Sequence, residues 1–428
     1  MRLLALLSVA ALAATALTSC GGSGPPEVKA CAARERGSRA TASPAPREPF
    51  VGVLTAGVDS SVILARLDPL TLRPVSRQVR VGEYHDAWSL SPDGSQLALG
   101  RGGQGIGITL VDLEPVRLVR QVHTGIAAEA LGWLAPHRLV AGLQRGGTVL
   151  IDPVTGRVIR RWTGFSFPDA SAPTRQGLIL LLPQWRSSAP NLPLTRVSGP
   201  ARLAVVDTRG RLRSVTLERI PLAVHMTRGS YYEDRAGLAV DTARARAYVV
   251  AAGAPVAEVD LNTMRVSYHL ELAGSGSTEP PTAQQRGALW LGDGRIAVFG
   301  RDLTAADGGK LTATPAGVTL IDTRDWSACM LDERASRAAF AAGRLITYGP
   351  GPPVSRDDEG VGLRAYVVGG GEAIHLFDGQ QVWDVKLVGD DAYVRTATAV
   401  HIIDVTSGKV LATIARPLEL ADVISGTS

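Results

Sequence analysis

Short runs of apolar, mostly β-branched residues alternate with turn residues along most of the chain. In the clearest example, an apolar run ends at Asp152, a turn with Gly156 follows, and the apolar pattern resumes at Val158. An Asp side chain can accept backbone N–H groups two residues further on, and Gly tolerates a positive φ. This stretch therefore predicts two short antiparallel strands joined by a tight turn.

The same strand-end Asp recurs along the chain, at Asp68, Asp112, Asp152, Asp207, Asp260, Asp322 and Asp404. The last interval is about twice the shorter ones, so we place a hidden unit without this Asp at 363–376. The seven intervals between Asp68 and Asp404 then cover 336 residues and average 48. A second hairpin lies upstream of the Asp in several units, most clearly at 87–99 around Pro92-Asp93-Gly94.

Two hairpins per unit make a four-stranded blade. A repeat of roughly 40–50 residues that contains only strands and turns is typical of a β-propeller. We therefore predict an all-β fold, a single β-propeller of four-stranded blades. The repeat count gives eight blades, with seven as the alternative.

Two groups of motifs carry a family resemblance. The string SPDGSQLA at 91–98 resembles repeats of WD40-like and TolB-like propellers, whereas 152–162 and 404–411 resemble quinoprotein-like or YVTN-type repeats. The resemblance spans roughly 50–416 and implies a propeller. Quinoprotein repeats usually place Trp four residues after the turn Gly, but this chain has Arg160 and Ala412 there. This departure argues against a quinone cofactor.

The first blade has only three strands of its own, expected at 50–56, 62–67 and 75–81. The missing innermost strand is predicted from the apolar segment 418–424 near the C-terminus. The N- and C-terminal strands would then close the ring within one blade, which removes exposed sheet edges.

The N-terminus reads as a targeting segment. Residues 1–20 contain an apolar core that is too short to span a membrane comfortably, and 17–20 (Leu-Thr-Ser-Cys) resemble a bacterial lipobox. The resemblance implies a lipoprotein signal and lipidation of Cys20; an ordinary signal peptide is the alternative. Residues 21–49, rich in Gly, Pro, Ser, Ala and Arg, read as a flexible tether, and 50–428 as the propeller. We expect the protein at the cell membrane, lipid-anchored on the extracytoplasmic side, with no other membrane contact.

The chain has three cysteines. If Cys20 carries lipid, Cys31 and Cys329 remain, and an exported chain with two Cys favours a disulfide. Cys329 is expected on the outermost strand of blade six, where an N-terminal arm could reach it. The alternative is two unrelated thiols.

The long connections are all predicted on one face of the ring, at 183–200, 224–236, 273–287, 301–316 and 349–361. Loops on a rigid scaffold commonly carry function, and aromatic residues with Arg favour protein interfaces. The candidate binding face comprises Trp185, Arg186, Tyr231, Tyr232, Glu233, Asp234, Arg235, Arg356, Asp357, Asp358 and Glu359. The alternative is a set of solvated loop charges.

Candidate chemistry is sparse. The seven His have no metal-ligand spacing, and the pair His85 and Asp86, in a blade-to-blade loop, is a candidate axial site with a structural alternative. The acidic stretches 357–359 and 233–234 could bind calcium, although the Asp-x-Asp-x-Asp pattern is missing. The strand-end Asp residues are expected to be structural. We predict no catalytic residues, no metal and no cofactor.

The charge pattern narrows the choice of partner. The net charge is +5, scattered along the chain, and no basic cluster with interleaved aromatic residues points to nucleic acid. We expect a monomer that acts as a non-enzymatic binding or scaffold module at the envelope. Its partner would be an envelope protein or a small extracellular ligand on the long-loop face. The alternative is an enzyme with an axial site, either a lactonase-like hydrolase or a quinoprotein-like dehydrogenase.

Overall fold

The computed structural model describes residues 29–31, 48–55, 61–101, 106–144, 146–165, 168–183, 196–227, 230–272, 281–305, 311–349, 360–368, 373–415 and 420–424. These residues form β-strands, turns and connections and contain no α-helix. No helix in this part of the chain could therefore cross a membrane.

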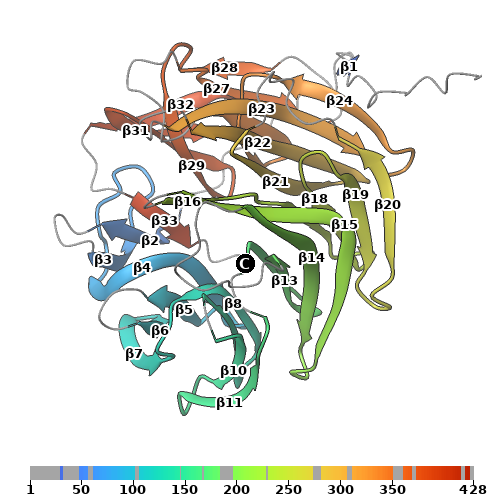
Figure 1. The fold of residues 1–428 in the computed structure, drawn as a ribbon. Helices are drawn as coiled ribbons and strands as arrows, with labels where there is room; N and C mark the ends of the chain where they lie inside the picture. Colours follow the sequence, from blue (N-terminus) through green and yellow to red (C-terminus); the bar gives the residue numbers. More distant parts are fainter. Residues whose placement is uncertain are drawn as a thin grey trace, which may run out of the picture.

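The strands form eight four-stranded blades around a central axis (Figure 1). From the axis outwards, blade one consists of β33 (Leu420–Ile424), β2 (Phe50–Thr55), β3 (Ser61–Leu67) and β4 (Val79–Leu90), and blade two consists of β4 again, β5 (Gln96–Arg101), β6 (Gly107–Leu113) and β7 (Val116–His123). Blade three consists of β8 (Ala128–Ala135), β9 (Arg138–Leu143), β10 (Thr148–Asp152) and β11 (Arg157–Trp162). Blade four consists of β12 (Ala170–Thr174), β13 (Gly177–Pro183), β14 (Arg196–Asp207) and β15 (Leu212–Thr227), to which β16 (Ser230–Glu233) is added.

In the same order, blade five consists of β17 (Gly237–Asp241), β18 (Arg246–Val250), β19 (Pro255–Asp260) and β20 (Val266–Glu271). Blade six consists of β21 (Ala283–Gly292), β22 (Arg295–Ala305), β23 (Leu311–Asp322) and β24 (Ser327–Asp332), to which β1 (Lys29–Ala30) is added. Blade seven consists of β25 (Arg337–Ala341), β26 (Arg344–Tyr348), β27 (Leu363–Val367) and β28 (Ile374–Leu376), and blade eight of β29 (Val382–Val388), β30 (Asp391–Thr396), β31 (Ala399–Asp404) and β32 (Lys409–Ala415). The predicted count of eight is confirmed, and the hidden repeat at 363–376 supplies β27 and β28.

The ring closes as the sequence predicts. Strand β33 pairs antiparallel with β2, with Val51 opposite Ile424 and Leu54 opposite Leu420. Blade one therefore combines a C-terminal inner strand with N-terminal strands, and the edge of β2 that faces the axis is paired rather than exposed.

Strand β4 belongs to two blades. Its first residues pair with β3, and its last residues, from Trp88 to Leu90, pair with β5. The prediction of a blade-to-blade loop at His85 and Asp86 is therefore wrong, because both residues lie within this continuous strand. Their side chains lie outside the described part of the chain.

The strand-end Asp residues build the tight turns. Asp152 Oδ1 accepts the backbone N–H of Val154 at 2.9 Å, its Oδ2 accepts the Thr155 hydroxyl at 2.8 Å, and Gly156 follows with φ +74°. The hydrogen bond from the Thr155 hydroxyl lowers the pKa of Asp152 below its ordinary value, and the Val154 N–H adds to this effect. Asp404 makes the same turn with Ser407. At these turns the Asp side chains therefore have the structural role expected from the sequence.

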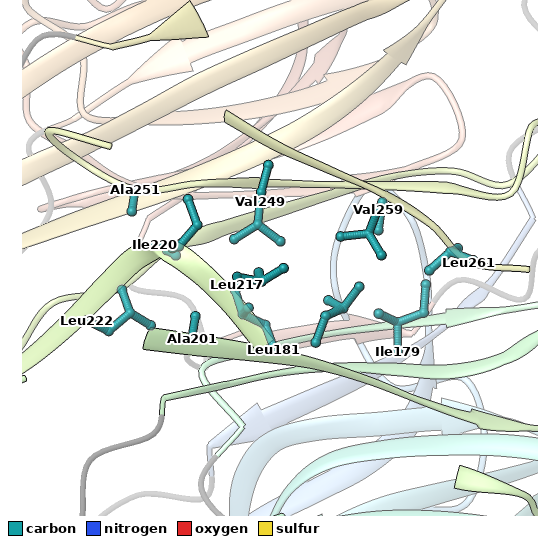
Figure 2. Packing of buried hydrophobic residues seen from close by; sticks show 14 of the residues in the cluster. Ile179, Leu181, Ala201, Leu217, Ile220, Leu222, Val249, Ala251, Val259 and Leu261 are labelled. Carbon is teal, nitrogen blue, oxygen red and sulfur yellow. The ribbon is translucent and has the colours of Figure 1, made fainter. Parts of the chain in front are cut away.

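The hydrophobic core is divided into layers between neighbouring blades. In the described residues, a cluster of buried apolar side chains lies at each of the eight blade interfaces. Figure 2 shows the layer between blades four and five, where Ile179, Leu181 and Leu217 of blade four meet Val249 and Val259 of blade five. Small and branched aliphatic residues fill this layer, as the low aromatic content predicts.

The N-terminal arm is joined to blade six. Cys31 and Cys329 form a disulfide, and Lys29 and Ala30 pair in parallel with Cys329 and Met330 on the outer strand β24. The predicted disulfide and its place on the outermost strand of blade six are both confirmed.

We call the face that carries the strand-two-to-three and blade-to-blade connections the long-loop face, and the opposite face the short-turn face. Several loops predicted on the long-loop face are strands instead. Strands β14 and β15 extend to pair Arg196 with His225, β16 continues the hairpin, and β22 and β23 extend to pair Ala305 with Leu311. The polar side chains of these segments suggested loops, but cross-strand pairing continues through them.

Candidate functional site

Charged side chains gather on the long-loop face where the inner strands begin. Because blade-to-blade connections lie on this face, the residues that precede or start β12, β17, β21 and β25 lie near the axis there. We call this group the axial charge cluster; its members are Asp169, Glu233, Asp234, Arg235, Gln284, Gln285, Arg286, Arg301, Asp302 and Arg337. In the view of Figure 1, the β15–β16 hairpin, which leads into Glu233, runs from blade four towards the middle of the ring.

Asp234 ties three elements together. Its Oδ2 accepts the N–H of Ala223 on β15 at 3.1 Å, and its Oδ1 accepts the N–H of Gln284 on β21 at 2.9 Å. The next residue, Arg235, exchanges backbone hydrogen bonds with Gln284 and Arg286. The connection between blades four and five is therefore hydrogen-bonded to blade six.

Asp169 links blade four to blade five. Its side chain is 5% exposed, its Oδ2 accepts the N–H of Ala236 at 2.8 Å, and its Oδ1 lies 3.9 Å from Arg235 Nε. Burial raises the pKa of Asp169 to about 7, and the Glu233 and Asp234 carboxylates add to this rise while the Ala236 N–H and Arg235 oppose it. Asp169 therefore titrates near neutral pH.

Glu233 extends the acidic side of the cluster. Burial raises its pKa above the ordinary value, the exposed Glu129 on β8 adds to the rise, and Arg235 opposes it. Carboxylates from blades three and four and from the connection between blades four and five thus lie on one side of the axial rim.

The basic side of the cluster lies on blades six and seven. Arg301 Nε donates to Gln285 Oε1 at 3.1 Å, and Arg337 Nη1 donates to the carbonyl of Trp383 on blade eight at 3.3 Å. Burial lowers the pKa of Arg301, and the positive charges of Arg337 and Arg235 lower it further. Arg301 is therefore close enough to Arg235 and Arg337 to be repelled by both charges.

A buried ion pair lies beneath this basic side. Arg286 Nη1 donates to Asp302 Oδ1 at 2.8 Å, and the two side chains are 7% and 3% exposed. Gln284 Nε2 lies 3.4 Å from the same oxygen. A buried carboxylate that loses its partner costs several kcal/mol, so we assign Arg286 and Asp302 a structural role.

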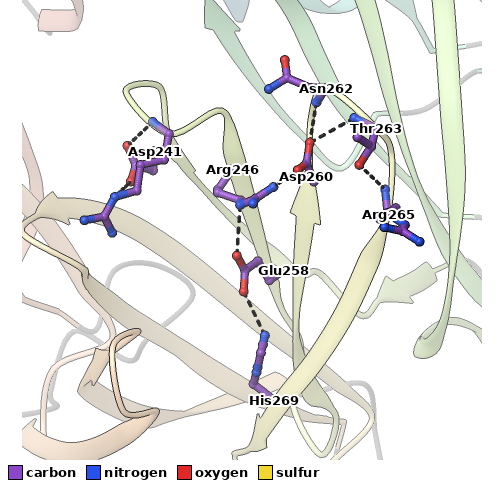
Figure 3. Close-up of polar contacts among 9 residues, drawn as sticks. Asp241, Arg246, Glu258, Asp260, Asn262, Thr263, Arg265 and His269 are labelled. Carbon is purple, nitrogen blue, oxygen red and sulfur yellow. Dashed lines mark hydrogen bonds and ion pairs between the residues drawn. The ribbon is translucent and has the colours of Figure 1, made fainter.

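A second polar group lies on the outer strands of blade five. Figure 3 shows Arg246 between Glu258 and Asp260, with His269 Nε2 2.9 Å from Glu258 Oε2. The His269 ring stacks on Trp326 of blade six at 3.6 Å between centroids. This group lies at a packed blade interface, so its position is explained by holding blades five and six together.

The structure brings together only part of the predicted binding face. Glu233, Asp234 and Arg235 join the axial charge cluster, and Tyr232 lies beside them on β16. Tyr231 is on β16, with a side chain outside the described part of the chain. The other predicted residues lie outside the described residues: Trp185, Arg186, Arg356, Asp357, Asp358 and Glu359. Asp234 uses both carboxylate oxygens on backbone N–H groups, which leaves it poorly suited to calcium. No group of three or more potential metal-ligating side chains occurs among the described residues.

Sequence reasoning missed Asp169, Arg301 and Arg337. Arg301 lay at the start of a predicted loop, and Asp169 and Arg337 precede or begin the inner strands β12 and β25, which the sequence analysis did not place. All three blade positions share one signal: Asp169 and Arg235 lie one and two residues before an inner strand, and Arg337 is the first residue of one.

The comparisons with known proteins establish the fold. The chain resembles the structure titled "Dihydro-heme d1 dehydrogenase NirN in complex with DHE" with a TM-score of 0.56 and 15% identity, over 89% of this chain and 76% of that one. It resembles apo AztD from Citrobacter koseri with a TM-score of 0.50 and 11% identity, over 88% and 97% of the two chains. The chain is a β-propeller. No protein-family model and no curated protein sequence matches it. At these identities the similarity concerns the fold alone.

Chemically, the axial charge cluster offers a carboxylate that titrates near neutral pH beside a partly exposed Arg, and opposite it a group of guanidinium donors. Hydrogen-bond donors and acceptors on a rigid rim suit binding of a charged partner. The carboxylates of Asp169 and Asp234 accept hydrogen bonds from backbone N–H groups, so the side chains of this rim are already positioned before any partner binds.

Proposed function

We propose that this protein is a lipid-anchored, extracytoplasmic β-propeller that binds a partner protein of the cell envelope through its long-loop face, without catalysis. The observation that carries the proposal is the unequal elaboration of the two faces. On the long-loop face, blades four and six extend their hairpins and the axial charge cluster gathers. On the short-turn face, the strand-three-to-four turns are mostly tight Asp turns such as the one at Asp152.

The binding surface combines the features expected of a protein interface. Arg235 has a side chain that is 57% exposed, and Tyr232 and Glu233 lie three and two residues before it in the chain. Tyr and Arg are enriched at interface hot spots, and charged groups on a rigid rim steer association and give specificity. A monomeric propeller would present this whole face to its partner.

The cysteines support the proposed location. A disulfide between Cys31 and Cys329 suits an oxidising compartment outside the cytoplasm. Cys20 ends a lipobox-like sequence, and eleven residues lead from it to Cys31. Fully extended, that segment spans at most about 40 Å. If Cys20 carries lipid, the disulfide therefore holds the outer edge of blade six near the membrane.

This orientation has a direct test. In Figure 1, β24 of blade six and β7 of blade two lie on opposite sides of the ring. Dyes attached through Ser327→Cys on β24 and Leu118→Cys on β7, both exposed positions, are compared for energy transfer to a dye in the membrane. We expect stronger transfer from position 327, and equal transfer from both sites would contradict the orientation.

The partner is tested by photo-crosslinking in cells that produce the full-length protein. A photoreactive phenylalanine derivative replaces Tyr232 on the long-loop face or, as a control, Val154 in a short turn of blade three, where the side chain is 56% exposed. We expect a discrete adduct with one envelope protein from position 232 and none from position 154. Equal adducts from both positions, or none from position 232, would refute binding through the long-loop face.

A further inference from the structure

The described residues of the N-terminal arm are held to blade six by few hydrogen bonds. Lys29 and Ala30 pair in parallel with β24, and the Cys31 N–H donates to the Met330 carbonyl at 2.9 Å. Ordering a backbone residue costs about as much free energy as one hydrogen bond returns. A strand of two residues therefore does not hold this arm by itself, and the covalent bond from Cys31 to Cys329 does so.

The disulfide lies where a thiol can reach it. Cys31 and Cys329 are both partly exposed, and β24 is the outermost of the four strands that make up blade six. Figure 1 shows β1 beside β24 at the outer edge of the ring, away from the axis. Exchange between thiols and disulfides requires access of a thiolate to one sulfur atom, and this position provides that access.

The state of the disulfide determines which blade is joined to the N-terminus. When it is closed, the chain from Cys20 meets blade six at Cys31, over at most about 40 Å of extended chain. When it is open, the first strand of the ring after Cys20 is β2 of blade one, which begins at Phe50. Phe50 is 30 positions after Cys20, and a segment of that length spans at most about 100 Å. Blade one lies three blades from blade six around the ring.

We infer that the Cys31–Cys329 disulfide is a redox-sensitive strap. When it is closed, it keeps the outer edge of blade six next to the anchored N-terminus. When it is opened, the arm leaves β24 and the point of attachment moves to blade one. The longer tether also lets the ring turn, so the long-loop face is no longer held at one angle to the membrane.

A dithiol, either a small molecule or a pair of cysteines on another protein, is the class of reductant that opens the strap. One of its thiolates attacks a sulfur of the disulfide and forms a mixed disulfide, and its second thiol group then displaces the sulfur of the protein. The dithiol ends as a disulfide, and Cys31 and Cys329 end as thiols. Two electrons and two protons have then passed from the dithiol to the protein.

This inference rests on the proposed function in one respect, because the effect on orientation requires lipid on Cys20. Release of the arm does not require it, so the two are measured separately. Hydrogen exchange of the purified full-length protein in detergent micelles is followed by mass spectrometry before and after addition of dithiothreitol. We expect the peptide that contains 29–31 to lose its protection on reduction, while the peptide that contains β10 and β11 of blade three keeps its protection.

Matched variants locate the effect. Cys329→Ser should leave the arm unprotected with and without dithiothreitol, whereas Ser327→Ala, at an exposed position on the same strand, should respond as the wild type does. Cys20→Ala keeps both disulfide cysteines and should also respond as the wild type does. An arm that stays protected after reduction, or in Cys329→Ser, would overturn the inference. Loss of protection in blade three as well would also overturn it, because the disulfide would then hold the fold rather than an arm.

The orientation is then followed in vesicles that carry the full-length protein. An azide-bearing phenylalanine derivative replaces Ser327 on β24 or Leu118 on β7, so that dyes are attached without cysteine chemistry. Energy transfer to a dye in the membrane should be stronger from position 327 before reduction, and the difference should be lost after it. A difference that persists although the arm has been released would overturn the transfer of attachment to blade one. Equal transfer before reduction, together with release of the arm on reduction, would instead contradict the proposed anchoring and leave the strap standing.

Discussion

Replacing Asp169 with Asn should make the protein more stable at neutral pH and leave it nearly unchanged in acid. Asn keeps an oxygen that can accept the Ala236 N–H but cannot ionise. In the folded protein the pKa of Asp169 is about 7, whereas its ordinary value is 3.8. Between these two values the folded state holds a proton that the unfolded chain has lost. Stability therefore falls as pH rises from about 4 to about 7 and is constant above that range.

The magnitude follows from the difference in pKa. A difference of about 3 in pKa corresponds to about 4 kcal/mol, because each pKa unit is worth about 1.4 kcal/mol. The side chain is 5% exposed, so little of this cost is relieved by solvent. The free energy of unfolding of Asp169→Asn should then equal that of the wild type near pH 4 and exceed it by up to about 4 kcal/mol near pH 8.

The assay is urea unfolding followed by Trp fluorescence at several values between about pH 4 and pH 8. Asp260→Asn serves as the control, because a hydrogen bond from Arg246 lowers the pKa of Asp260 to about 2. That carboxylate stabilises the fold above its unfolded pKa, so its loss should be destabilising and nearly constant over the same pH range. If the free energies of unfolding of the wild type and Asp169→Asn change in parallel with pH, the loss of stability between about pH 4 and about pH 7 does not come from Asp169.

Three further predictions concern the ends of the chain. Cys20→Ala should abolish metabolic labelling with a radioactive fatty acid, and unchanged labelling would mean that the anchor lies elsewhere. Ending the chain at Arg416 removes β33, uncovers the buried Val53 and Leu54 on β2, and should cost about 3 kcal/mol or more in urea unfolding; an unchanged midpoint would show that β33 does not close the ring. Cys329→Ser should lower the free energy of unfolding by less than about 5 kcal/mol, the chain-entropy value for so long a loop, because ring closure already restrains the chain; non-reducing peptide mapping that finds free thiols in the wild type would refute the disulfide.

The architecture was predictable because its signals are local and repeated. Each Asp turn is specified within a few residues, as at Asp152 and Gly156, and the spacing of such turns gives the number of blades. Ring closure was predictable by counting, since blade one lacked a strand and the C-terminus had one to spare. The disulfide followed from the number of cysteines left after Cys20.

The candidate site was only partly predictable because it depends on contacts between blades. Nothing near Asp169 in the sequence indicates that its carboxylate meets the N–H of Ala236, and burial produced by that contact is what raises its pKa. Likewise, Arg301 and Arg337 become neighbours only when blade seven packs on blade six. The polar composition of 301–316 suggested a loop, although the same residues pair as strands. The polar composition of a segment indicates that its side chains are exposed to solvent, but it does not indicate whether its backbone pairs with a neighbouring strand.

The excess of Arg over Lys shows how composition and blade packing are connected. Of the 45 basic residues, 41 are Arg. At several blade interfaces an Arg donates to the turn between strands three and four of the next blade: Arg138 to the Thr208 carbonyl, Arg213 to the Leu261 and Asn262 carbonyls, and Arg344 to the Thr406 carbonyl. Arg66 reaches Glu114 in the same way. A guanidinium group can place several donors on neighbouring turn carbonyls at once, whereas an ammonium group is a single point of charge. These contacts between neighbouring blades therefore explain the use of Arg rather than Lys at these four positions. The Arg residues near the axis differ from these, because Arg235 lies beside the Asp169 carboxylate and Arg286 pairs with Asp302 rather than with a turn.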